Sequence, residues 1–305
     1  MQTKKISNKK AFAFSITLWI VASLLLASVV ILRFAKNEVE VSSGLNSKLQ
    51  TTLMADSVLE SLKFYVPTAD YTSTSLKNSL LLNSKYPLPS EIIVDGREYN
   101  ITKNITISLK DTSSMLNILR SSSIAVAYAL TSKDNEELFP ILKDSLADWV
   151  DRDNVPNVNG AEQSRYRNII VRDSKAIQDI HELKLIKGFD KVNIETIKEN
   201  LYYGRGSTVN FMLINNSRYL AYFLETDESF MKSMLELRKS EPKKFIKNLN
   251  TLPGFNDDYM GFYLSKQFII KIKAQEGRAK TYIDAIISFK QLKSKPYIIV
   301  SYILK

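Results

Sequence analysis

The chain of 305 residues contains no cysteine and only one histidine, His181. Without cysteine no disulfide can stabilise an exported form, so its stability must come from packing or from a bound metal ion. A lone histidine in a helical pattern is usually structural. The sequence also contains neither a P-loop nor a G-x-S-x-G motif. We therefore expect the protein not to be an enzyme.

Charge is absent from residues 11–32, and the first acidic residue of the chain is Glu38. At about 1.5 Å per residue the uncharged run would span roughly 33 Å as a helix, enough to cross the hydrocarbon core of a bilayer. Lysines at positions 4, 5, 9 and 10 precede the run. This asymmetry predicts a single-pass membrane protein with a cytoplasmic N-terminus and its bulk on the other side.

Three interpretations of this segment compete. A cleaved secretory signal would have a shorter apolar core, roughly 7–15 residues, and a small-x-small cleavage site after it. A plain signal-anchor helix is the second interpretation. The third is a type IV prepilin leader, which is cut before the apolar helix. The junction Lys10-Ala11-Phe12 fits the third, so we expect residues 1–11 to be a leader cut between Ala11 and Phe12, or one residue earlier.

The helix is expected to continue beyond the membrane. Its membrane half would be 12–33 and its outer half 34–66, where leucines at 45, 49, 53, 59 and 62 recur at helical spacing. The pattern stops at Val66-Pro67, because the residue before a proline is biased away from helix. An anchor followed by a separate helix is the alternative.

The remainder divides into strands, a helical block and strands. Asp95-Gly96 is a hairpin signal, and residues 92–94 and 99–109 predict strands in a first β segment at 67–114. Residues 115–256 are mostly helical in pattern, and 257–305 return to β-rich composition. Neither short β segment would be stable alone, so a helical domain inserted in a sheet is favoured over two tandem domains. The fold class predicted is α+β.

An acidic loop at 148–162 could bind a metal ion. Counted from Asp151, oxygen-bearing side chains fall at positions 1, 3, 7, 9 and 12, which are Asp151, Asp153, Asn157, Asn159 and Glu162. This spacing is close to that of a calcium loop. Val155 and Pro156 exclude an EF-hand, although Val155 could still offer its carbonyl oxygen. The alternative is an Asp/Asn-rich turn that caps the next helix.

Two glycine turns, at 183–189 and 249–255, resemble helix-hairpin-helix units that contact DNA. Asp190, Asp257 and Asp258 lie beside them and would repel phosphate, which favours packing turns and makes nucleic acid an unexpected partner. The net charge of +10 does not change this, because four of the charges lie in the predicted leader and the others are spread along the chain.

The sequence resembles the minor pseudopilin K (general secretion pathway protein K) family of bacterial type II secretion. The resemblance rests on the basic leader with its apolar helix, on 109–117, on Asp148-Trp149-x-Asp151-x-Asp153 leading to Gly160-Ala161-Glu162 and Tyr166, on 177–188, and on 209–215. Ser114 replaces a glycine of the family pattern. The family's second acidic cluster, after Gly-Ala-Glu, is replaced by Gln163-Ser164.

This resemblance implies a pilin fold, in which a long N-terminal helix packs on an antiparallel sheet with a large helical domain inserted in the sheet. It also implies structural calcium in the insert, cleavage by prepilin peptidase with methylation of the new N-terminus, and a place in the inner membrane with the bulk periplasmic. The implied partners are the minor pseudopilins I and J and the major pseudopilin, at the tip of the pseudopilus.

One residue supports the tip position on physical grounds. If cleavage leaves Phe12 first, the fifth mature residue is Ile16, where ordinary pilins carry glutamate. That carboxylate offsets the buried N-terminal ammonium of a neighbouring subunit. A subunit with nothing stacked ahead of it has no such charge to neutralise. Two other functions stay open, a DNA-uptake pilin that uses the glycine turns and an anchored periplasmic protein without an assembly role.

Overall fold

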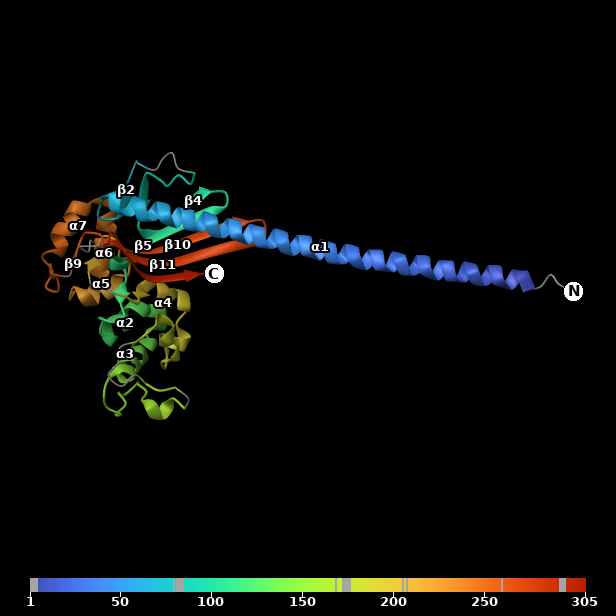
Figure 1. Cartoon of the computed structure of the whole chain (residues 1–305). Coiled ribbons are helices and arrows are strands. Elements are labelled where there is room, and N and C mark those ends of the chain that lie inside the picture. Colours follow the sequence, from blue (N-terminus) through green and yellow to red (C-terminus); the bar gives the residue numbers. More distant parts are fainter. Residues whose placement is uncertain are drawn as a thin grey trace.

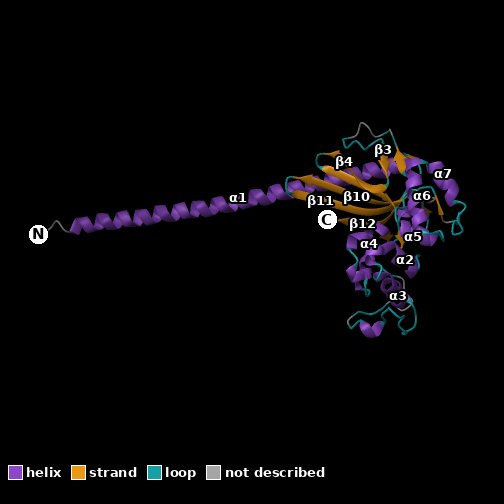
Figure 2. Ribbon diagram, turned by 180° about the vertical axis from the view of Figure 1, so that it is seen from behind, coloured by secondary structure: helices purple, strands orange, loops and turns teal. Residues whose placement is uncertain are grey.

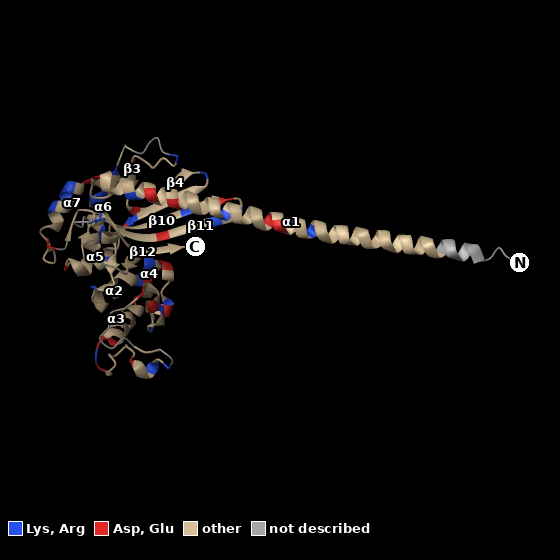
Figure 3. Cartoon of the chain, viewed as in Figure 1, with Lys and Arg blue, Asp and Glu red and all other residues tan. Residues whose placement is uncertain are grey.

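The computed structural model describes residues 5–305 except 79, 81–84, 168, 172–176, 205, 207, 259 and 291–294. Its first element is α1 (Lys5–Thr68), a helix of 64 residues that projects far beyond the rest of the protein (Figure 1). The first four residues of the predicted leader lie outside the described part. Within that part, one helix is long and apolar enough to cross a membrane; the candidate spans Phe12–Thr68, and its most apolar window has a mean hydropathy of 2.5 with no residue buried. Figure 3 shows the half of α1 that lies farther from the sheet in tan, without charged residues over its described part. These properties are those of a single-pass membrane anchor.

The outer half of α1 packs on the sheet through a face that the leucine spacing did not identify correctly. Ala55, Val58, Leu62 and Val66 are fully buried, whereas the leucines at 45, 49 and 53 are 51–67% exposed. The predicted stripe is therefore split, because only its last two members, at 59 and 62, face the sheet. The helix also continues through Pro67 and ends at Thr68, two residues beyond the predicted end.

The central sheet is antiparallel, with the strand order β12-β11-β10-β5-β4. Its strands are β4 (Asp95–Thr102), β5 (Ile105–Asp111), β10 (Gln267–Glu276), β11 (Ala279–Ser288) and β12 (Ile298–Leu304). Alternate side chains of β5, β10 and β11, such as Ile107, Ile272 and Ile283, are buried beneath α1. The helix thus covers one face of the sheet (Figure 2).

The hairpin predicted at Asp95-Gly96 is wrong. β3 (Glu91–Ile93) pairs with β2 (Ser75–Lys77), while β4 pairs with β5, so Asp95-Gly96 carries the chain from one sheet to another. The hairpin lies at residues 103–104, between β4 and β5, and it divides the single strand predicted at 99–109. Alternating apolar residues continue across this turn, which conceals it in the sequence.

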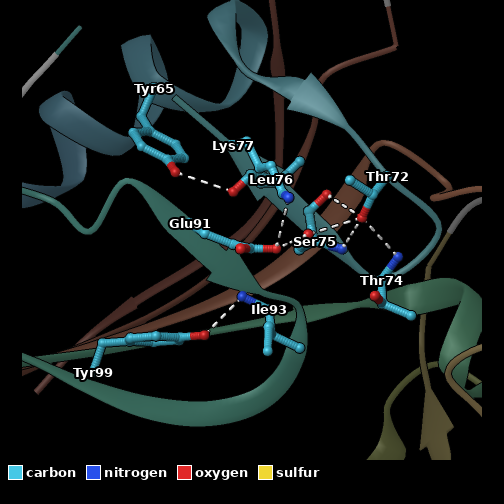
Figure 4. Close-up of polar contacts among 9 residues, drawn as sticks. All are labelled: Tyr65, Thr72, Thr74, Ser75, Leu76, Lys77, Glu91, Ile93 and Tyr99. Carbon is cyan, nitrogen blue, oxygen red and sulfur yellow. Dashed lines mark hydrogen bonds and ion pairs between the residues drawn. The ribbon is translucent and has the colours of Figure 1, made fainter. Parts of the chain in front are cut away.

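A small sheet, with the order β1-β2-β3, covers the end of α1; β1 is Asp70–Tyr71. The Tyr65 hydroxyl of α1 donates to the Leu76 carbonyl oxygen at 3.1 Å, and the Ser75 hydroxyl donates to Glu91 at 2.7 Å. The Ile93 amide donates to the Tyr99 hydroxyl of β4 at 2.7 Å. Figure 4 shows how these contacts join α1, the small sheet and the central sheet.

A largely helical insert, residues 112–266, connects β5 to β10. Figure 1 shows α2, α3 and α4 of the insert on the side of the sheet opposite α1, and α6 and α7 near the end of α1. It has its own hydrophobic core, which includes Trp149, Phe189, Phe211 and Phe245. Its helices are α2 (Ser123–Leu130), α3 (Leu138–Val150), α4 (Ile194–Asn200), α5 (Ser217–Phe223), α6 (Glu228–Ser240) and α7 (Pro242–Leu249), with 3-10 turns η1 (Thr112–Ser114), η2 (Lys133–Asn135), η3 (Gln163–Arg165), η4 (Ile180–Leu185) and η5 (Phe189–Lys191). Two parallel pairs, β6 (Leu116–Asn117) with β7 (Leu201–Tyr202) and β8 (Val209–Asn210) with β9 (Met260–Gly261), hold distant parts together. The predicted α+β fold, with a long N-terminal helix on an antiparallel sheet and a helical insert, is confirmed.

Asp111 joins the two ends of the insert. Its carboxylate is fully buried and accepts hydrogen bonds from the Ser113 amide at 2.7 Å and hydroxyl at 2.5 Å, where the insert begins. It also accepts one from the Ser265 amide at 2.9 Å, where the insert ends. The Thr112 and Ser265 hydroxyls lie 3.2 Å apart. One side chain therefore fixes the insert to the sheet at both crossings.

Candidate metal centre

Three carboxylates meet where the acidic loop leaves α3. Asp148 lies in the last turn of α3, Asp151 is its C-cap, and Glu162 is the residue before η3. One carboxylate oxygen of each lies within 4.8 Å of the others. Asp148 is 1% exposed and Glu162 is 3% exposed, so the cluster is largely shielded from water.

Glu162 is the least satisfied member of this cluster. Both of its carboxylate oxygens are buried, and neither accepts a hydrogen bond from the described part of the chain. Burial raises the pKa of the Glu162 carboxyl above its ordinary value, and the negative charges of Asp151, Asp148 and Asp153 raise it further. Such a group needs either a proton or a nearby cation to be stable.

The donor set of this cluster fits a hard divalent cation. Carboxylate oxygens are the ligands that calcium prefers, and Asp148, Asp151 and Glu162 offer them at one place. An ion bound there would also supply the buried Glu162 carboxylate with the partner that it lacks among the described residues. The role of such an ion would be structural, because the ion would link the end of α3 to the far end of the loop.

The other candidate ligands from the loop spacing are not members of this cluster. Asp153 is exposed, and its carboxylate accepts a hydrogen bond from the Val155 amide at 2.9 Å. Val155 itself is 72% exposed. Asn157 donates its backbone amide to Asp148 at 3.2 Å and its side-chain amide to the same carboxylate. Asn159 donates from both amides to Asp144, at 3.1 and 3.0 Å.

The two asparagines therefore fasten the loop to α3, since their amides point at Asp148 and Asp144. Glu162 makes no side-chain capping bond to η3, which is the next helical turn. The binding of calcium and the identity of its ligands stay predictions.

Asp148 was missed as a ligand because the loop was counted from Asp151. Asp144, Asp148 and Asp151 are separated by four and then three residues, which places all three on one face of a helix. That spacing was the available signal. Gly160 is the second residue whose role needed the structure, because a Cβ there would lie 1.9 Å from an Asp148 carboxylate oxygen.

The side chains around the loop hold it in place. The Trp149 indole donates to Glu182 at 2.8 Å, and its ring meets the Tyr166 ring edge-on at a centroid distance of 5.1 Å. The Lys187 ammonium donates to the carbonyl oxygens of Asn159 and Gly160, both at 2.8 Å. The contacts of Trp149, Tyr166 and Lys187 thus hold the acidic loop in place beside the carboxylate cluster.

The glycine turns are packing turns within the insert. Gly188 has φ +88°, and a Cβ there would lie 2.7 Å from Ile141 Cγ2. A Cβ on Gly254 would lie 2.6 Å from the Phe223 carbonyl oxygen. Both turns press against neighbouring segments of the insert, so their glycines are explained without a contact to DNA.

Replacing Gly188 by alanine should lower the melting temperature of the protein by several degrees. The side chain would have to adopt a left-handed backbone conformation and also displace Ile141, at a cost of about 1–3 kcal/mol. Gly44→Ala is the matched control, because no atom lies within 4 Å of its added Cβ and alanine favours helix. Thermal melts monitored by circular dichroism measure both. Equal melting temperatures would contradict a packing role.

Comparisons with known proteins bear on part of the insert and on the fold of most of the chain. Residues 127–201, which include α3, the acidic loop and α4, match the family of type II secretion system protein K. The fold resembles a chain in the crystal structure of the GspK-GspI-GspJ complex from the enterotoxigenic Escherichia coli type 2 secretion system, with 12% sequence identity and a TM-score of 0.50. That match covers 89% of this chain and 99% of the other. No curated protein sequence matches. The resemblance to the minor pseudopilin K of type II secretion is confirmed.

Proposed function

We propose that this protein is the minor pseudopilin K of a type II secretion system, placed at the tip of the pseudopilus. There it would assemble with minor pseudopilins I and J and begin the filament that helps to export folded proteins. The observation that carries this proposal is the insert with the protein K signature, built into a pilin-like sheet behind an apolar N-terminal helix. On this proposal the chain has a structural role and no catalytic one.

Exposed apolar surfaces on the globular part support an assembly role. Leu45, Leu49 and Leu53 of α1 are each more than half exposed outside the predicted membrane segment. The edge strand β12 adds Tyr302 and Leu304, exposed by 43% and 47%. Exposed apolar side chains gathered on a helix and an edge strand are typical of interaction sites, and neighbouring pilin-like helices would cover them.

The tip position has two further supports. Ile16 stands where a subunit inside the filament would carry a carboxylate. That carboxylate would neutralise the N-terminal ammonium of the neighbouring subunit stacked ahead of it. The part of the insert that holds α2, α3 and α4 extends away from the sheet on the side opposite α1 (Figure 1), where it would widen a narrow fibre. The predicted location in the cell rests on the apolar helix and on the lysines that precede it. The basic N-terminus would stay in the cytoplasm, α1 would cross the inner membrane, and the sheet and insert would be periplasmic.

Assembly can be tested by co-expressing the full chain with the I and J pseudopilins of the same bacterium and purifying them in detergent. We expect a stable ternary complex, and the double variant Leu49→Glu/Leu53→Glu should dissociate from it because two charges would enter an apolar contact. Ser57→Glu is the control, since it places a charge on the same helix at an exposed polar residue. Failure of the wild-type chain to bind either pseudopilin would refute the proposal.

The mature chain should begin at Phe12, or at Ala11 if the cut falls one residue earlier. The expectation rests on the Lys10-Ala11-Phe12 junction and on an apolar helix that continues without a break into the part of α1 that packs on the sheet. Mass spectrometry of the N-terminus in cells with and without prepilin peptidase measures it. An intact Met1 end in peptidase-positive cells, or a cut beyond Leu32, would contradict the prediction.

A further inference from the structure

The last strand of the central sheet, β12, has one open edge. Among the residues that the structure describes, its single neighbour in the sheet is β11, and it lies at the margin of the sheet (Figure 2). Lys305 and Tyr282 exchange both of their backbone hydrogen bonds, each at 3.0 Å. Opposite residues alternate between bonded and unbonded pairs along an antiparallel ladder. The amide and carbonyl groups of Tyr302 and Leu304 therefore point away from β11.

The sequence of β12 lacks the features that usually protect an edge strand. Residues 298–304 contain no charged residue and no proline. Five of these seven side chains are 38–47% exposed, namely Ile299, Val300, Tyr302, Ile303 and Leu304. The opposite edge of the same sheet is β4, which carries the exposed charges of Arg97 and Glu98 and whose pairing with β5 is interrupted twice by register shifts. Charges and bulges keep an edge strand from pairing, so β12 is the edge that stays open to another strand.

Only another strand can pair with the backbone groups of this edge. A helix packed on β12 would cover its side chains but would leave the amides and carbonyls of Tyr302 and Leu304 without partners once water is excluded, and unpaired buried backbone groups are costly. An extended segment would bond to both residues and place alternate side chains on the two faces of the sheet.

The side chains that such a strand directs toward α1 have to be apolar. The Tyr302 hydroxyl donates to Asp56 of α1 at 3.3 Å, so β12 runs beside this part of the helix. Leu49 and Leu53 precede Asp56 by seven and three residues, which places them on the same side of α1. Both leucines are more than half exposed. The added strand would therefore meet apolar side chains on the α1 side.

A second copy of the chain in the same membrane cannot supply an antiparallel strand. Lys48 of α1 donates to the Lys305 carbonyl oxygen, Asp56 contacts Tyr302, and Lys63 lies over the Tyr297 ring. β12 thus runs antiparallel to α1, and its arrow points toward the free part of α1 in Figure 1. Two chains joined by antiparallel β12 strands would project their apolar helices in opposite directions. Antiparallel pairing is the more stable kind, so the strand has to come from a different protein.

We propose that the open edge of β12 binds an extended segment of a different protein as an additional antiparallel strand. Backbone hydrogen bonds with Tyr302 and Leu304 hold the segment, and apolar side chains at alternate positions face α1. The assembly role proposed above does not require this contact, and the test uses this chain alone, so either proposal can fail without the other.

The test uses the full chain in phosphatidylcholine nanodiscs and fluorescein-labelled peptides of the sequence Lys-Val-Thr-Val-Thr-Val-Thr-Lys. Opposite residues of an antiparallel pair share a face, so the valines that face α1 are also the residues whose amides bond to β12. One peptide is N-methylated at its three valines and the other at its three threonines. Fluorescence anisotropy, corrected with empty nanodiscs, should show the valine-methylated peptide binding roughly tenfold more weakly or worse, because it has lost its donors to β12.

Two variants of Tyr302 decide whether the open edge is the site. Tyr302→Pro removes the outward amide but no hydrogen bond to β11, and proline is tolerated at such positions of edge strands. It should abolish the difference between the two peptides. Tyr302→Thr keeps the amide and loses the same contact with Asp56, so it should keep the difference. Leu304→Pro repeats the test at the end of the strand if Tyr302→Pro does not fold.

Four results would overturn the proposal. Equal binding of the two methylated peptides would show that backbone pairing is not involved, and no binding of either at millimolar concentration would show that the edge takes no strand. Weaker binding of the threonine-methylated peptide would indicate a parallel strand. Self-association of the wild-type chain in light scattering, abolished by Tyr302→Pro, would make a second copy the occupant.

Discussion

Replacing Asp111 by alanine should destabilise the protein more than any other single change outside the hydrophobic cores. The amides of Ser113 and Ser265 would lose their acceptor while staying buried, and each unsatisfied donor costs about 1–3 kcal/mol. We expect the free energy of unfolding to fall by about 2–5 kcal/mol and the melting temperature by roughly 5–10 °C. Circular dichroism measures the melt, and limited proteolysis should find new cuts near residues 112–114 and 264–266.

Asp111→Asn separates the loss of acceptors from the loss of volume. Asparagine keeps the size but turns one oxygen into a donor that would face an amide, so a smaller but clear loss is expected. Asp134→Ala is the control, because Asp134 is an exposed carboxylate of the insert and its loss should change stability by less than about 0.5 kcal/mol. If Asp111→Ala melted at the same temperature as the wild type, other contacts would hold the insert at its two junctions with the sheet.

The sequence contained enough to predict the architecture but not its local pairing. A long uncharged run followed by leucine spacing predicted one helix, and two β-rich segments around a helical pattern predicted an insert in a sheet. The hairpin prediction at Asp95-Gly96 was wrong because a turn signal does not indicate whether the strands on its two sides pair with each other. β3 and β4 pair with other partners, and the true hairpin at 103–104 has no glycine or proline. Strand pairing depends on long-range contacts that local composition does not record.

The helix stripe shows the same limit. Leucine spacing identified an amphipathic helix, but the face that packs on the sheet uses Ala55 and Val58, small residues that let α1 approach the strands. The exposed leucines at 45, 49 and 53 belong to a second apolar face that no element of the described chain covers. A sequence pattern cannot distinguish a face buried within the chain from one that another chain would cover.

The spacing of oxygen-bearing side chains located the candidate site but did not identify all the residues that form it. Loop spacing indicated the right segment, and Asp151 and Glu162 do lie together in it. The count treated the loop as isolated, whereas α3 contributes Asp148 from its own last turn and the loop folds back onto it through Asn157 and Asn159. Which oxygens converge depends on how a loop docks on its helix, and this docking requires Gly160 to lie against Asp148.

Calcium should raise the melting temperature of the full chain in detergent micelles by several degrees. The ion would bind the folded loop and not the unfolded chain. A ligand present at 100 times its dissociation constant adds about 2.7 kcal/mol to the free energy of unfolding. Melts in millimolar calcium and in a chelator give the increment directly, and magnesium is the control cation, because it demands a smaller and more regular coordination shell.

Two matched variants decide which carboxylates bind the ion. If the cluster of Asp148, Asp151 and Glu162 is the site, Asp153→Asn should keep the calcium increment, because Asp153 is exposed and bonded to the Val155 amide. If the loop spacing is right instead, Asp153→Asn should abolish it. Asp148→Asn should behave in the opposite way, although it will also weaken the contacts from Asn157.

Glu162→Gln gives the sharpest result, because its two effects have opposite signs. Without calcium the variant should melt above the wild type, since it removes one of three crowded negative charges and a buried carboxylate that accepts no hydrogen bond from the described residues. Its amide could also donate to Asp148 or Asp151. With calcium it should melt below the wild type, because a ligand oxygen has lost its charge. The two melting curves should therefore exchange order when calcium is added. If the wild type melted at the same temperature in calcium and in chelator, the cluster would not be a metal centre at all.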